Sequence, residues 1–224
     1  MITVPEATKK IVERSRYLTE AMSKGLINYS SLARYIKPEL EQMLLKPVSE
    51  AAILMALRRV EQELQPKWQP LKIFTTPPDM IVRSNLFEIT VTNSDTLSTS
   101  YQKLFTKHTE NKTSFFTMTE GMIETTFIAS IDLKAAFDEI LQNQTIITTI
   151  DRLSGITIRL PEESITTSGV YYFFLKSLAW EGINITEVVS TYLELTIILH
   201  EKHVHQAFSI LQSLFTQPEQ VAHE

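Results

Sequence analysis

The chain has 224 residues, of which 43% are hydrophobic and 21% charged, and its net charge is −5. This composition is ordinary for a folded protein and excludes a disordered or fibrous chain, and the length fits one to three compact domains. The absence of cysteine excludes a disulfide scaffold, a cysteine nucleophile and thiolate metal sites.

Composition changes near residue 65. Residues 1–65 contain three threonines, and ten Lys and Arg against eight Asp and Glu, whereas the 154 residues from Leu71 contain 23 threonines. Threonine favours strands, and the proline-containing stretch 65–70 cannot continue a helix. We therefore expect a helical domain at 1–65 and a linker with a candidate strand at 66–85. The net negative charge does not attract nucleic acid, so only 1–65 could contact it.

The first domain is predicted to be helical throughout. A helix is expected from Glu6 to Lys24, ended by Gly25 in a left-handed conformation. Two short helices, Ser31–Ile36 and Glu39–Leu45, are separated by Pro38, since proline disfavours a helical conformation at the residue before it. A last helix begins at Ser49 and carries a stripe of apolar residues: Ile53, Met55, Ala56, Leu57, Val60 and Leu64.

From Leu86 the hydrophobic pattern changes to a period of two. Phe87, Ile89 and Val91 alternate with Glu88, Thr90 and Thr92, which is typical of a half-buried strand with its polar residues outward. A helix from Leu97, a hairpin around Glu120-Gly121, a helix from Leu133 and a strand at 145–150 complete a β-α-β-β-α-β unit over 86–150.

The same order recurs over 151–215, followed by a polar tail at 216–224. Its expected elements are a strand at 156–160, a polar loop at 161–169, a helix from Val170 that stops at Gly182, strands at 183–191 and 193–200, and a final helix from Val204. One strand is missing from this second copy. The predicted fold class is α+β, a helical module followed by two ferredoxin-like units.

The second unit also resembles a known family. The pattern is a helix that ends at Gly182-Ile183-Asn184-Ile185, followed by strands up to Leu199. This pattern resembles an ACT domain, and most closely the ACT domains in the regulatory part of aspartokinases. In that family one ACT unit is inserted into the other. The resemblance therefore implies that Lys72–Thr75 or Met80–Arg83 supplies the missing strand, and that an amino-acid effector binds between paired units.

The candidate effector site lies around the second unit's first helix. Backbone N–H groups at a helix N-terminus suit a carboxylate, and the Asn184 amide can both donate and accept hydrogen bonds. The predicted effector-binding residues are Thr166, Thr167, Ser168, Gly169, Val170 and Asn184. The alternative is that Thr167 or Ser168 only caps the helix.

The helical domain has two interpretations. Residues 28–36 resemble the first helix of a helix-turn-helix, and 47–53 could open a recognition helix, with Ser49, Arg58 and Arg59 as candidate nucleic-acid contacts. The connection 37–46 is longer than usual for this motif. The alternative is a helical domain for dimerisation or for contact with another protein.

No catalytic motif, glycine-rich phosphate loop or cofactor signature is present. His200, His203 and His205 are interpreted as solvated side chains rather than metal ligands. With no signal peptide or membrane span expected, the sequence predicts a cytoplasmic protein.

The predicted function is non-catalytic regulation: an amino acid binds the ACT-like units of a homo-oligomer, and the helical domain passes the signal to DNA or to a protein. The alternative is a stand-alone regulatory subunit or adaptor of an amino-acid biosynthetic enzyme, without DNA binding. A structural dimer that binds no ligand is a third reading.

Overall fold

The computed structural model describes residues 2–63, 70–110 and 114–215. The chain divides into two compact units, Met1–Gln69 and Pro70–Glu224, which we call the helical unit and the sheet unit. The division falls in the stretch where the sequence composition changes. The predicted tail 216–224 and residues 66–69 of the predicted linker lie outside the described residues.

The helical unit contains α1 (Val4–Arg14), α2 (Arg16–Ser23), α3 (Tyr29–Leu44) and α4 (Glu50–Glu63) around one apolar core. The expected single helix from Glu6 to Lys24 is wrong, because Ser15 adopts an extended conformation between α1 and α2. The Ser15 hydroxyl accepts a hydrogen bond from the N–H of Leu18, so this serine caps α2.

Helix α3 replaces the two short helices expected on either side of Pro38, which lies inside it. Asn28 caps the helix by accepting a hydrogen bond from the N–H of Ser31. Ile36 and Leu40, before and after the proline, are fully buried. Their burial outweighs the missing N–H of Pro38, since each buried aliphatic side chain contributes about 1.5–3 kcal/mol.

Replacing Pro38 by alanine should therefore stabilise the helical unit by about 1–2 kcal/mol, since alanine restores one backbone hydrogen bond and part of the gain is lost to a more flexible unfolded chain. Urea unfolding of the full chain, followed by circular dichroism, measures this. Ala33→Pro, at a buried position of the same helix, should abolish folding of the unit. A Pro38→Ala variant that is less stable than the parent would contradict this account.

The sheet unit is built on one antiparallel sheet of six strands in the order β2-β3-β1-β4-β6-β5. The strands are β1 (Met80–Thr92), β2 (Phe116–Glu120), β3 (Glu124–Ser130), β4 (Ile146–Arg159), β5 (Glu187–Ser190) and β6 (Glu194–His200). This confirms the predicted α+β class and places β2 and β5 at the two edges.

Two long central strands are shared between the expected units. Residues 86–92 of β1 pair with β3, and residues 153–159 of β4 pair with β6. We call the sheet around these segments the first and the second half-sheet. Each half-sheet has the ferredoxin-like strand order, because β4 also supplies the last strand of the first and β1 the last strand of the second.

Residues 80–83 of β1 pair with 155–158 of β4, which confirms Met80–Arg83 as the strand missing from the second copy. Lys72–Thr75 is not a strand; a 3₁₀ turn covers Pro70–Ile73. The strands expected at 145–150 and 156–160 are one continuous strand, β4, so the predicted boundary between 150 and 151 falls inside it.

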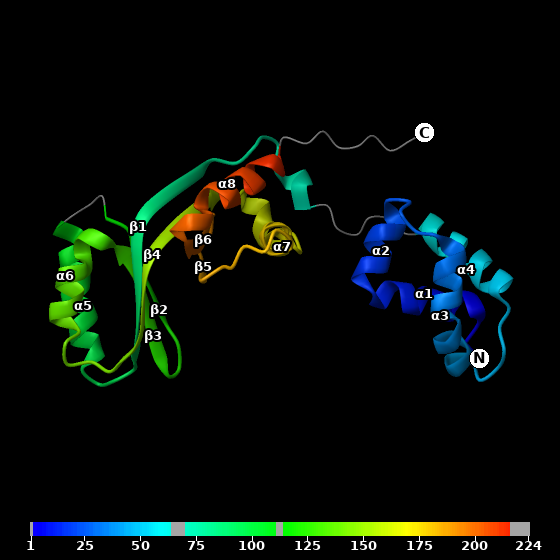
Figure 1. Ribbon diagram of the computed structural model, residues 1–224, viewed down its shortest axis with the longest axis horizontal. Helices are drawn as coiled ribbons and strands as arrows, with labels where there is room; N and C mark the ends of the chain where they lie inside the picture. The colour runs from blue at the N-terminus through cyan, green and yellow to red at the C-terminus, as the bar shows by residue number, and fades with distance from the viewer. Residues whose placement is uncertain (1, 64–69, 111–113, 216–224) are drawn as a thin grey trace. The chain divides into compact units, whose positions relative to one another are not determined.

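Helices cover one side of each half-sheet (Figure 1). Helices α5 (Leu97–Glu110) and α6 (Lys134–Ile140) pack on the first, against Phe87, Ile89 and Val91. Helices α7 (Val170–Trp180) and α8 (Val204–Ser213) pack on the second. Glu88 and Thr90, expected to face solvent, are buried. No helix among the described residues is both long and apolar enough to cross a lipid bilayer.

Candidate functional site

The loop predicted to bind an effector leads from β4 to α7. A short 3₁₀ turn covers Glu162–Ile165, and the N–H groups of Thr166 and Thr167 both donate to the carbonyl of Glu163, at 3.2 and 3.0 Å. Gly169 has a φ of 88° and begins α7, a left-handed conformation that glycine adopts without strain. The side chains of Thr166 and Ser168 are exposed.

No side-chain cap is formed at the start of α7. The N-cap residue is Gly169, so the alternative reading of Thr167 or Ser168 as a plain cap is wrong. The side chain of Val170 is buried in the core of the second half-sheet, and only its backbone could face a ligand. The first N–H groups of α7 therefore lack a capping side chain and can donate hydrogen bonds to an anion.

Asn184 lies beyond the other end of α7. Gly182 has a φ of 69°, and the N–H groups of Gly182 and Ile183 donate to the carbonyls of Ala179 and Leu178. This double hydrogen bond is the glycine-terminated helix end that the sequence predicts. Ile183 is buried, whereas Asn184 is exposed, as expected.

The two parts of the predicted site, the 166–169 loop and Asn184, are not brought together within one chain. Helix α7 has 11 residues between them, which at 1.5 Å per residue separates them by about 16 Å. A single amino acid cannot span that distance. If Asn184 contacts a ligand held by the 166–169 loop, the two must come from different copies of the chain.

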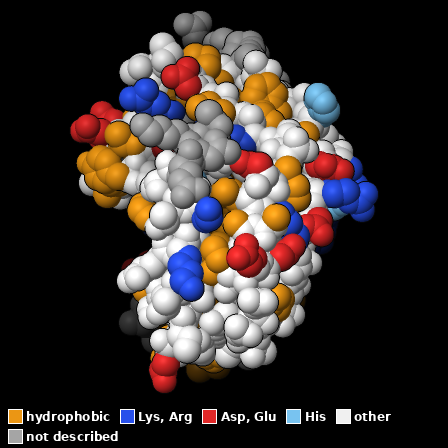
Figure 2. Space-filling view, turned by 90° about the vertical axis from the view of Figure 1, so that its left-hand side faces the viewer, with side chains coloured by type: hydrophobic (Ala, Val, Ile, Leu, Met, Phe, Trp, Pro, Cys, Tyr) orange, Lys and Arg blue, Asp and Glu red, His pale blue; other side chains and the backbone are white. Residues whose placement is uncertain are grey.

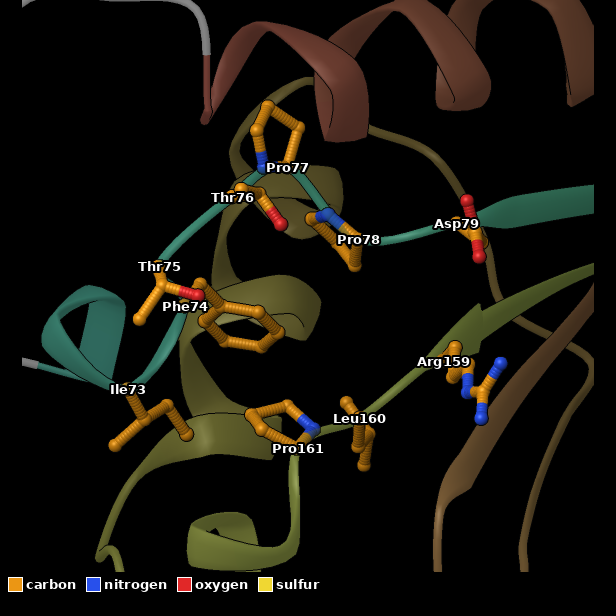
Figure 3. A pocket seen from close by; sticks show the side chains of 10 residues that line it. All are labelled: Ile73, Phe74, Thr75, Thr76, Pro77, Pro78, Asp79, Arg159, Leu160 and Pro161. Atoms are coloured by element: carbon orange, nitrogen blue, oxygen red, sulfur yellow. The ribbon is translucent and has the colours of Figure 1, made fainter.

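A cavity of about 300 Å³ opens beside the start of this loop (Figure 3). One wall is the segment 73–79 that leads into β1, and the other is the end of β4, residues 159–161. Phe74 lies in the centre of the view, with Leu160 and Pro161 facing it. The Phe74 ring packs edge-on against Phe174 and Phe215, with ring centres 6.0 and 5.1 Å apart, which fixes this wall to the core.

Opposite charges lie at one end of the cavity. Asp79 and Arg159 are held next to each other because the N–H of Arg159 donates to the carbonyl of Asp79 at 3.0 Å. Both side chains are exposed, and neither forms an ion pair or side-chain hydrogen bond with another residue that the structure describes. A carboxylate and a guanidinium at the mouth of a small, partly apolar cavity can bind the ammonium and carboxylate groups of a zwitterion.

The sequence did not single out the residues of this cavity as a site. The segment 73–79 has no periodic pattern, and Arg159 falls within the strand expected at 156–160. The one signal was Pro77-Pro78-Asp79, because two consecutive prolines hold a short segment extended and present the next residue in a fixed place.

The candidate nucleic-acid residues of the helical unit are partly engaged within it. The hydroxyl of Ser49 accepts a hydrogen bond from the N–H of Ala52 at 3.2 Å and so caps the start of α4. The guanidinium of Arg58 lies 5.6 Å from the ring centre of Tyr29. Arg59 is exposed. Because α3 extends to Leu44, the connection to α4 has five residues, 45–49, rather than the expected ten.

In the histidine cluster, His200 accepts a hydrogen bond from the N–H of Lys202 at 3.3 Å and so caps a turn, and His205 is exposed. Within the described ranges no group of three or more His, Asp or Glu side chains is placed to hold a metal ion.

Figure 2 views the sheet unit from the side of α5 and α6, where acidic, basic and apolar side chains are interspersed. An apolar groove of about 450 Å³ runs between α5 and the edge strand β2, lined by Tyr101, Gln102, Phe105, Thr106, Phe116 and Met118.

No protein-family description and no curated protein sequence matches this chain. Solved structures do. A structure of aspartokinase α and β subunits matches with 20% identity and a TM-score of 0.50, covering 63% of this chain and all of that chain. The aspartate kinase of Clostridium acetobutylicum, described as an allosteric enzyme, matches with 14% identity and a TM-score of 0.52 over 63% of this chain and 35% of that chain. The fold match confirms the predicted resemblance to the regulatory ACT part of aspartokinases.

Proposed function

We propose that this protein is a non-catalytic regulator whose sheet unit binds a free amino acid. The shared fold with aspartokinases, one of them described as allosteric, supports effector-binding regulation. The main support for the proposal is the cavity between 73–79 and 159–161, where the side chains of Asp79 and Arg159 pair with no other residue that the structure describes.

The cavity suits a small zwitterion. Arg159 can bind a carboxylate through two parallel N–H donors, and Asp79 can accept from an ammonium group. Phe74, Leu160 and Pro161 would contact the ligand's side chain. A volume of about 300 Å³ lies at the lower end of the range for ligand pockets, which favours an amino acid over a nucleotide.

Binding can be passed on through β1. The cavity wall 73–79 continues directly into β1, which also runs through the centre of the first half-sheet. A ligand that prefers one position of this segment would shift the arrangement of the sheet unit, since coupling requires different affinities for the two states. The unpaired edges β2 and β5 suit side-by-side pairing of two copies in a homodimer.

For the helical unit we favour docking on a protein, as in a regulatory subunit or adaptor of a biosynthetic enzyme, over contact with DNA. Ser49 and Arg58 already serve the unit's own structure. A gel shift at low salt should detect no affinity for duplex DNA. Binding that weakens steeply with salt and is lost on replacing Arg58 and Arg59 by alanine would support DNA binding instead.

A thermal-shift screen of the twenty amino acids tests the effector proposal. A ligand at ten times its Kd should stabilise the protein by about 1.4 kcal/mol. Arg159→Gln and Asp79→Asn should remove the response, whereas Lys202→Gln, an exposed cation elsewhere on the sheet unit, should keep it.

Two outcomes oppose this assignment. If Ser168→Ala and Asn184→Ala remove the response while Arg159→Gln does not, the effector binds at the 166–169 loop, between two copies of the chain, rather than in the cavity. If none of the amino acids shifts the melting temperature, the effector proposal itself is wrong.

A further inference from the structure

The two half-sheets contact each other through a small apolar cluster on the side away from the helices. Its buried members are Leu86, Ile128, Leu153 and Ile198, with Phe115, Ile150 and Val189 packed against them. The cluster draws on all six strands or the residues next to them. It is much smaller than the core of either half-sheet, so the contact that it forms is a weak one. We call it the latch.

Two carboxylates flank the latch, one from each half-sheet. Glu88 is directly opposite Ile128 on β3 and Ile150 on β4, and Glu187 is directly opposite Ile198 on β6. Residues directly opposite each other in a sheet point to the same face, so both glutamates lie on the latch side. Glu88 is 4% exposed, and its Oε2 atom has no hydrogen-bond partner among the described residues.

The strands that join the half-sheets are bent at the latch. Strand β3 pairs with β1 only over 86–92, and β6 pairs with β4 only over 153–159, so β1 and β4 alone connect the halves. Both strands have a register shift beside the Leu86–Leu153 pair, with left-handed φ values of 59° at Asn85 and 57° at Arg152. Such bulges bend and twist a two-stranded connection, which makes this the place where the angle between the halves can change.

We propose that the latch is a proton-dependent switch: it is closed while Glu88 is neutral and opens about the bulges at Asn85 and Arg152 when Glu88 ionises. A carboxylate without a partner is costly to bury, whereas a neutral carboxyl group costs much less. Separating the half-sheets lets water reach the carboxylate, and only the small latch contact is lost. The switch does not depend on the effector proposed above.

The groups around Glu88 support this assignment. The latch residues on the neighbouring strands are all apolar: Ile128 on β3, Ile150 on β4, Val189 on β5 and Ile198 on β6. Glu187 is the one charged group on these elements that acts on it, and the nearest cation on its own strand, Arg83, stacks on the ring of Phe115. Burial, with a smaller contribution from Glu187, raises the pKa of Glu88 to about 7.

The test is a distance between the two halves as a function of pH. The chain has no cysteine, so Lys103→Cys on α5 and Ser209→Cys on α8, both exposed, create the only two labelling sites for nitroxides. Pulsed electron spin resonance should show one short distance at about pH 5 and a longer, broader distribution at about pH 8.5, where the carboxylate is ionised. Far-UV circular dichroism should stay the same.

Variants separate the switch from general effects of pH. Glu88→Gln should keep the short distance at every pH. Glu187→Gln should move the transition to a lower pH than in the parent, because removal of a like charge favours the ionised form of Glu88. The proposal is overturned if the parent distance does not change with pH, or if it changes equally in Glu88→Gln.

Discussion

Replacing Phe74 by alanine should lower the free energy of unfolding of the sheet unit by about 3 kcal/mol, the lower end of the range for Phe→Ala in a core. Phe74 is partly buried and its ring packs against both Phe174 and Phe215. The substitution removes these contacts and leaves a gap where helix α7 meets the segment 73–79. Chemical unfolding followed by circular dichroism measures the loss.

The same variant should lose its response to the amino acid that stabilises the parent, because Phe74 forms the wall of the proposed binding cavity. Phe105→Ala is the matched control. Phe105 is 58% exposed on α5, away from this cavity, so its loss should cost less than about 1 kcal/mol and leave the ligand response unchanged. Equal losses of stability in the two variants would show that the Phe74 contacts do not hold the segment in place.

The sequence pattern predicted those elements whose signals are local. Alternation at Phe87, Ile89 and Val91 marked the second half of β1, and Gly182 marked the end of α7. The first half of β1 contains Arg83, Ser84 and Asn85, which look like a loop. What makes it a strand is its pairing with residues 155–158 of β4, more than sixty positions away in the sequence.

Contacts with distant parts of the chain also explain two wrong expectations: that β4 would be two strands, and that the side chain of Glu88 would face solvent. Asp151, Arg152, Ser154 and Gly155 indicate a break between two strands, yet the ladder with β1 carries the chain through it. Alternation placed Glu88 on a solvated face, and that face is covered only because the two half-sheets pack on each other. The proposed cavity cannot be predicted from local sequence, because the segment 73–79 is held in place by packing of Phe74 against the distant residues Phe174 and Phe215.

The buried carboxyl group of Glu88 should make the stability of the sheet unit depend on pH. Its pKa is raised to about 7 in the folded protein from an ordinary value of 4.5. Between these values the folded state binds more protons than the unfolded state, so the free energy of unfolding falls as the pH rises, and above pH 7 the contribution becomes constant. Glu88→Gln should remove this dependence.

The expected result is a variant about as stable as the parent near pH 4.5 and more stable by about 3 kcal/mol near pH 8, since each pKa unit corresponds to about 1.36 kcal/mol. Urea unfolding at several pH values measures the difference. Glu187→Gln should recover a smaller part of it, because the charge of Glu187 is the lesser cause of the raised pKa. A constant offset between Glu88→Gln and the parent at all pH values would mean that the amide changes the packing of the latch and that the pKa of Glu88 is the same in the folded and unfolded states.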